Sequence, residues 1–138
     1  MKALTPYLNF VPGKSREALE FYKKALKGEI ENLQTFADAK QDTPPGMAGE
    51  VMHAVFRIGD FRFMASAGNP KDPVRQGNNM SLTLECENAA EQDAFWKGLS
   101  EGANVTMPLQ DTFWGARFGM LTDRYGINWM LNWQKPQG

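Results

Sequence analysis

The chain carries two copies of one sequence pattern, and this internal repeat limits the folds that it can adopt. Residues of the first copy recur 74 positions later, with one offset kept through a strand, a helix and the following turn. The repeated residues are Leu8, Glu17, Phe21, Lys23 and Gly28, which recur as Leu82, Glu91, Phe95, Lys97 and Gly102. An offset kept over this length indicates a duplicated structural module. The 138 residues are therefore expected to form two similar halves.

The helix of the first half is predicted over residues 15–27. Its apolar stripe follows the period of 3.6 residues per turn. The stripe consists of Ala18, Phe21, Tyr22, Ala25 and Leu26. Ser15 is of a residue type that often caps a helix N-terminus, and Gly28 suits the position just after a helix.

The helix of the second half is predicted over residues 89–100. Asn88 is suited to cap it, and Glu91 lies three residues later, as in a capping box. Gly102 follows the predicted end of this helix.

Alternating and β-rich segments predict the strands. They are expected over residues 4–11, 51–58, 61–66, 80–87, 114–122 and 127–133. Gly59 and Asp60 predict a two-residue hairpin turn. Asp123 and Gly126 predict a second turn, in which Asp accepts backbone hydrogen bonds and Gly adopts a positive φ.

The order of these elements predicts an α+β fold in one domain, with modules at residues 1–67 and 79–138. Residues 68–78, which contain two Pro and two Gly, are expected to link the modules. Residues 38–49 predict a long loop that can serve as a lid.

Alternation along the predicted strands separates an apolar face from a mixed face. Met52, Ala54, Phe56 and Ile58 are expected to pack on a helix, with Trp129 and Leu131 doing the same in the last strand. The mixed face is expected to carry Tyr7, Asn9, His53, Arg57, Ser81, Thr83, Glu85, Asn128, Met130 and Asn132. Such a face is typical of a small-molecule cleft, although a solvated sheet surface is the alternative. Met64 and Met130 favour the cleft.

Composition excludes several classes of function. The formal net charge is −1, so no basic excess favours nucleic-acid binding. A single cysteine, Cys86, and a single histidine, His53, exclude an internal disulfide, a thiolate metal cluster and any site with two imidazoles. No apolar run is long enough to cross a membrane and the N-terminus lacks a secretory pattern, so we expect a cytoplasmic protein without membrane contact.

Three residues have alternative interpretations. His53 is either a cleft residue, acting as a general base or hydrogen-bonding a ligand, or a structural histidine satisfied by a neighbouring strand. Cys86 falls on an apolar strand face and is interpreted as a buried hydrophobic residue rather than a nucleophile. Trp114 is expected in the core or at the mouth of the cleft.

Several motifs together resemble the PhnB-like family. They are PYLNF at residues 6–10, EALEFY at 17–22, VMHA at 51–54, FWGA at 113–116, and DRYG at 123–126 followed by Trp129. This family belongs to the glyoxalase/bleomycin-resistance/dioxygenase group, the vicinal oxygen chelate superfamily. It also carries the domain label 3-demethylubiquinone-9 3-methyltransferase.

The resemblance implies two paired βαβββ modules whose mixed sheets curl around a cleft, commonly in a homodimer. In metal-using relatives, the first and last strands of each module supply His, Glu or Gln ligands to a divalent ion. The corresponding positions fall at Pro6 or Tyr7, near Met64, at Ser81 and at Met130. These residues are poor ligands for such an ion, so we expect no catalytic metal and no cofactor. The chain also lacks the glycine-rich motif of common S-adenosylmethionine sites, which gives the methyltransferase label little support.

The sequence and the resemblance together predict metal-independent binding of a small, partly apolar molecule by a homodimeric protein. Whether the protein is also an enzyme stays open, with His53 as the best catalytic candidate. The expected ligand-binding residues are Tyr7, Asn9, His53, Met64, Thr83, Trp114 and Met130. One alternative is a metal-dependent lyase, isomerase or dioxygenase of glyoxalase type that uses His53 and Glu85. Another is a dimeric module that has lost its ligand.

Overall fold

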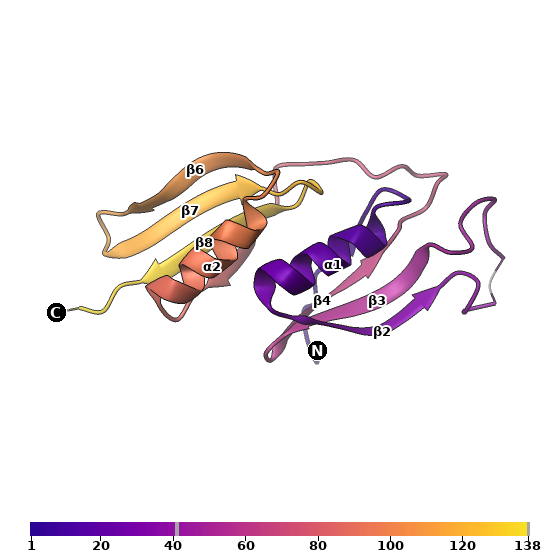
Figure 1. The fold of residues 1–138 in the computed structure, drawn as a ribbon, viewed down its shortest axis with the longest axis horizontal. Helices are drawn as coiled ribbons and strands as arrows, with labels where there is room; N and C mark the ends of the chain where they lie inside the picture. Colours follow the sequence, from indigo (N-terminus) through magenta and orange to yellow (C-terminus); the bar gives the residue numbers. More distant parts are fainter. Residues whose placement is uncertain (41, 138) are drawn as a thin grey trace. The chain divides into compact units, whose positions relative to one another are not determined.

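A computed structural model describes residues 1–40 and 42–137, which form two compact units, Met1–Arg75 and Gln76–Gly138. Each unit has one helix packed on one face of a four-stranded sheet (Figure 1). Neither helix is long and apolar enough to cross a membrane.

The first unit has the order strand, helix and three strands. Its elements are β1 (Tyr7–Asn9), α1 (Ser15–Leu26), β2 (Glu29–Thr35), β3 (Val51–Ile58) and β4 (Phe61–Ser66). The sheet order is β1-β4-β3-β2, with β1 parallel to β4 and the other pairs antiparallel.

The second unit repeats this topology. Its elements are β5 (Leu82–Glu85), α2 (Ala89–Leu99), β6 (Asn104–Asp111), β7 (Ala116–Thr122) and β8 (Asn128–Gln134). The sheet order is β5-β8-β7-β6, again with one parallel pair, β5 and β8. Two βαβββ modules with mixed sheets confirm the predicted α+β fold, and neither sheet is closed into a barrel.

The strand predictions were correct in position but too long at several ends, because propensity alone does not mark where pairing stops. β1 covers three of the eight residues expected, and Leu4 before it is 92% exposed. The alternation of apolar and polar residues did not predict β2 or β6. The pairing of β2 with β3 and of β6 with β7 contains register shifts. Irregular pairing interrupts the alternation from which a strand is recognised.

Aromatic packing joins α1 to its sheet. Tyr22 is fully buried, and its ring meets Phe63 of β4 edge-on at 5.7 Å between centroids. Phe56 of β3 stacks on Phe63 at 5.0 Å. Burying an aromatic side chain contributes roughly 1.5–3 kcal/mol, so this cluster is a main source of the unit's stability.

Both ends of α1 differ in detail from the prediction. The predicted cap, Ser15, is instead the first helical residue, and Lys14 before it makes no side-chain capping bond. The Ser15 hydroxyl is buried and donates to Glu50 Oε2 at 3.5 Å. At the other end Lys27 adopts the left-handed conformation, with φ of 54°. Gly28 follows it as predicted, but for a different reason: a Cβ there would lie 2.6 Å from the Arg57 carbonyl oxygen.

The capping prediction for α2 is confirmed. Asn88 Oδ1 accepts a hydrogen bond from the Glu91 N–H at 2.8 Å. Glu91 Oε1 accepts from the Glu87 N–H at 3.1 Å, one residue before the cap. Two N–H groups at the helix start are thus satisfied by side chains.

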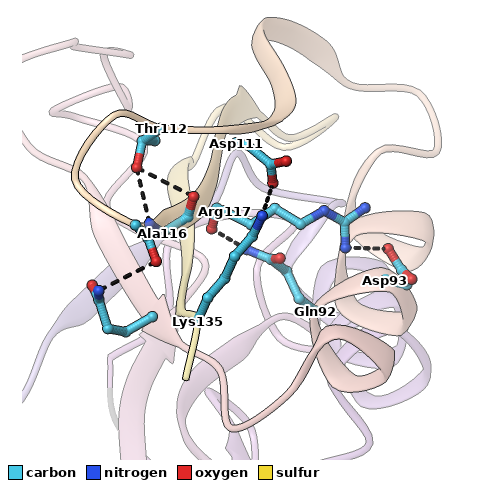
Figure 2. A network of polar contacts seen from close by, with 9 residues as sticks. Gln92, Asp93, Asp111, Thr112, Ala116, Arg117 and Lys135 are labelled. Carbon is cyan, nitrogen blue, oxygen red and sulfur yellow. Dashed lines mark hydrogen bonds and ion pairs between the residues drawn. The ribbon is translucent and has the colours of Figure 1, made fainter. Parts of the chain in front are cut away.

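A buried amide fastens α2 to the second sheet. Gln92 Nε2 donates to the Arg117 carbonyl at 2.8 Å and to the Leu131 carbonyl at 3.2 Å, which links the helix to β7 and β8. Gln92 Oε1 is buried without a hydrogen-bond partner. Figure 2 shows the neighbouring residue Asp93 paired with the Arg117 side chain, at 2.8 Å.

The turn after β7 forms as its sequence predicted. Asp123 is buried, and its Oδ1 accepts from the Tyr125 N–H at 2.8 Å and the Ile127 N–H at 3.1 Å. Its Oδ2 accepts from the Trp129 indole N–H at 2.8 Å. One carboxylate therefore shapes the turn and also orients the large buried ring of Trp129, the second residue of β8.

Cys86 lies just after β5 and is buried, as predicted. Burial raises the pKa of its thiol to about 11, and the charges of Glu91 and Glu85 act in the same direction. A raised pKa disfavours the thiolate, which is the nucleophilic form.

Gln92→Glu is predicted to destabilise the protein far more than Gln92→Met. A carboxylate at this position faces two carbonyl oxygens without solvent, which costs about 2 kcal/mol or more, whereas methionine removes the unsatisfied oxygen together with the two donated bonds. Urea unfolding at pH 7 measures both free energies.

The penalty of Gln92→Glu is expected to shrink at acid pH. The buried carboxyl has its folded-state pKa raised above the unfolded value, so stability is retained below the unfolded pKa and lost as pH rises. Equal unfolding free energies for the two variants at pH 7 would contradict this account of Gln92.

Cys86 is predicted to resist thiol reagents in the native protein. With a pKa near 11, about one thiol in a thousand is ionised at pH 8. Reaction with a chromogenic disulfide should be slow in buffer and fast in urea. Rapid stoichiometric labelling of native protein would show that the thiol is accessible and ionised.

Candidate functional site

The face of the first sheet opposite α1 brings together four of the predicted ligand-binding residues. We term this the first open face, and it carries Tyr7, Asn9, His53, Val55 and Met64. Tyr7 on β1 is paired with Met64 on β4, which is paired in turn with Val55 on β3. Their alternation with Phe56, Phe63 and Ala65, which face α1, fixes the side on which they lie.

A hydrogen bond on this face crosses a whole strand. Tyr7 Oη lies 3.1 Å from His53 Nδ1, and the ring centroids are 5.8 Å apart. Since β4 separates β1 from β3, this contact passes over the intervening strand. Tyr7 is 46% exposed to solvent.

The Tyr7–His53 pair always retains one donor for a third group. When the Tyr7 hydroxyl donates to Nδ1, the neutral imidazole carries its proton on Nε2. When Nδ1 carries the proton and donates, the Tyr7 hydroxyl can donate elsewhere. In both cases an acceptor site also remains, so the pair suits a ligand oxygen or nitrogen.

Arg57, predicted for this face, is neutralised there. Its guanidinium Nη2 lies 2.5 Å from Glu31 Oε1 on the neighbouring strand β2. Both groups are partly exposed, so the pair contributes little to stability, but it removes Arg57 as an unpaired charge.

The second open face, opposite α2, contains a row of methionines. The pairing register runs from Thr83 on β5 to Met130 on β8, Met120 on β7 and Met107 on β6. Thr83 and Met130 were predicted, whereas Met120 and Met107 were missed. The alternation of residues 114–122 could have placed Met120 on this face. Met107 lies beside a register shift, so alternation does not show on which face of the sheet it lies.

A second row on the same face combines polar and aromatic groups. It runs from Glu85 to Asn132, Phe118 and Gln110. The Asn132 amide donates to Glu85 Oε2 at 2.9 Å. The predicted residue Trp114 lies in the turn before β7 rather than in the strand, is 53% exposed, and has its ring centroid 6.5 Å from that of Phe118.

The positions that hold a metal ion in related folds do not fit one here. Pro6 or Tyr7, Met64, Ser81 and Met130 offer no imidazole or carboxylate. Within residues 1–40 and 42–137, no three His, Cys, Asp or Glu side chains gather closely enough to hold an ion. A divalent cation that prefers nitrogen or carboxylate ligands therefore lacks a ligand set in these residues.

Solved structures similar to the chain cover almost all of its length. Protein PA1353 from Pseudomonas aeruginosa is 36% identical, with a TM-score of 0.87, and the match covers 99% of this chain and 100% of that one. A putative 3-demethylubiquinone-9 3-methyltransferase, PhnB protein, from Bacillus cereus is 29% identical, with a TM-score of 0.77 and coverages of 96% and 99%.

A more distant structure shares the fold. The fosfomycin resistance protein FosX from Listeria monocytogenes, of the vicinal oxygen chelate fold, is 11% identical, with a TM-score of 0.65 and coverages of 98% and 94%. The family model described as 3-demethylubiquinone-9 3-methyltransferase matches residues 2–132. The duplicated modules, the sequence motifs and this match together show that the chain belongs to the PhnB-like family, 3-demethylubiquinone-9 3-methyltransferase by its model.

Proposed function

We propose that the protein binds a small, partly apolar molecule on its open faces without the help of a metal ion. The observation that carries this proposal is the composition of these faces. Hydrogen-bonding groups on these faces are interspersed with thioether and aromatic side chains. Such a mixture is more typical of a ligand-binding surface than of a sheet face exposed to solvent.

The two faces supply different interactions. On the first open face, the Tyr7–His53 pair offers directional hydrogen bonds. On the second, Met107, Met120 and Met130 offer a polarisable surface that adapts to the shape of a ligand. Binding would combine burial of apolar ligand surface with a few bonds that set its orientation.

The methyltransferase description of the family does not carry a methyl-transfer step to this chain. No G-x-G-x-G or G-x-G-x-x-G motif occurs, and both sheets are mixed rather than doubly wound and parallel. The glyoxalase-type alternative requires His53 and Glu85 as ligands, and these two donors from separate sheets are fewer than the three or four protein ligands of a tight site.

We also infer that the two units act as one domain and that the chain forms a homodimer. Each unit is smaller than most domains that fold alone, and each sheet has one face without a helix of its own unit. Light scattering on the purified chain gives the mass that tests this inference.

Chelator-treated protein is predicted to bind its ligand as tightly as untreated protein. A small-molecule screen by thermal unfolding should reveal compounds that raise the melting temperature, because a ligand at 100 times its Kd contributes about 2.7 kcal/mol. Calorimetry with Ni²⁺ and Zn²⁺ provides the complementary measurement. Micromolar binding of either ion at one site per chain, with ligand binding that depends on it, contradicts the proposal.

Tyr7→Phe is predicted to weaken binding of a screened ligand several-fold while leaving the melting temperature of the free protein nearly unchanged. The variant removes one hydrogen-bonding hydroxyl, about 1 kcal/mol, from an exposed position. Tyr125→Phe, in the turn after β7, is the matched control and should bind as the unmodified protein does. If both variants retain full affinity, the Tyr7 hydroxyl makes no hydrogen bond to the ligand.

A further inference from the structure

We infer that the second open face recognises planar aromatic cations, an inference that rests on the proposed function and names its ligand class. Three features of this face converge on that class: exposed ring surface, a carboxylate in the cross-strand row of Phe118, and no ion pair between that carboxylate and a basic side chain among the described residues.

The rings at the edge of the second open face leave aromatic surface uncovered. The Trp114 ring contacts those of Phe118 and Phe113, at 6.5 Å and 4.9 Å between centroids. Phe113 is 98% exposed and Trp114 53% exposed. Flat π-systems stack on such rings, and the thioethers of Met120 and Met130 in the adjacent row add favourable contacts with aromatic ligands.

Glu85 is held in the same cross-strand row as Phe118. Its Oε2 accepts from the Asn132 amide at 2.9 Å, and Asn132 is the residue paired with Phe118. Asn132 thus restrains the carboxylate on the side towards the aromatic residue. An N–H cation on a stacked ring can donate a charge-assisted hydrogen bond to such a carboxylate.

None of the basic residues of the second unit neutralises Glu85. Arg117 pairs with Asp93 on the helix side, and Lys135 pairs with Asp111. Lys97 lies on α2, and Arg124 lies in the turn after β7, over the Tyr125 ring. Within the described residues, no ion pair involves Glu85.

The surrounding charge has the same sign as Glu85. Residues 76–138 contain seven acidic and four basic side chains. The resulting negative potential favours cations over neutral or anionic ligands of equal shape. A cation on a ring stacked over Trp114 would also gain cation–π attraction.

The test compares two dyes at pH 8: 9-aminoacridine, which is cationic, and its parent ring acridine, which is neutral. Binding is followed by calorimetry and by quenching of dye fluorescence. The cation is expected to bind at least ten-fold more tightly, the effect of one charge-assisted hydrogen bond. Equal affinities for the two dyes overturn the inference.

Variants separate the two contributions. Glu85→Gln is expected to bring the two affinities within about three-fold of each other, whereas Trp114→Ala should weaken both dyes alike. Glu87→Gln makes the same charge change two residues away and should keep the preference for the cation. If Glu85→Gln keeps that preference, or Glu87→Gln loses it equally, the specific role of Glu85 is excluded.

A failure of the aromatic-cation inference can be distinguished from a failure of the proposed function. If neither dye binds but the screen finds another stabilising molecule, the proposed function holds and the aromatic-cation inference fails. If no compound raises the melting temperature, both fail. Circular dichroism confirms that each variant is folded, as expected for changes at exposed side chains.

Discussion

Each unit depends on the burial of one helix stripe against one face of a four-stranded sheet. Helix and sheet each have an apolar side that must be covered, and a single helix covers only one side of the sheet. In the first unit Tyr22 meets Phe63 and Phe56 is stacked on Phe63. The opposite face of each sheet is left for other interactions, and the candidate functional residues on the strands lie there.

The two copies solve this packing problem differently. Trp96 stands where the repeat places Tyr22, and it lies so close to β7 that a Cβ on Gly119 would be 2.8 Å from the indole ring. The larger ring therefore requires a glycine beneath it. At the position of Ala18 the second copy has Gln92, which replaces apolar contact with hydrogen bonds to two strands. The same backbone module thus accepts different side chains between helix and sheet, provided that they hold the helix against the sheet.

Local chemistry in the sequence predicted the features that depend on neighbours along the chain. Asn88 and Asp123 act as their residue types indicate, since a cap and a turn involve groups within a few residues. Alternation placed Tyr7, His53 and Met64 on one face, because the period of a strand is two. It did not predict the contact from Tyr7 to His53, which depends on the order of three strands.

The predictions that were wrong concern residues whose contacts depend on tertiary structure. Ser15 resembles a cap, but tertiary structure brings Glu50 within reach of its hydroxyl, and the helix begins one residue earlier than a Ser15 cap requires. Trp114 lies in a turn whose backbone closes between Thr112 and Ala116, so its contact with Phe118 is set by the turn and not by alternation. Met107 was missed because its strand was not recognised.

The register shifts in β2 and β6 affect the edge strand of each sheet. These strands lie at corresponding ends of the two sheet orders, and each departs from regular pairing, with Asn32 at a positive φ and Pro108 lacking an N–H. A straight incoming strand finds no continuous ladder of donors and acceptors on such an edge. Both copies of the module therefore carry built-in protection against uncontrolled strand addition, the first step towards amyloid-like association.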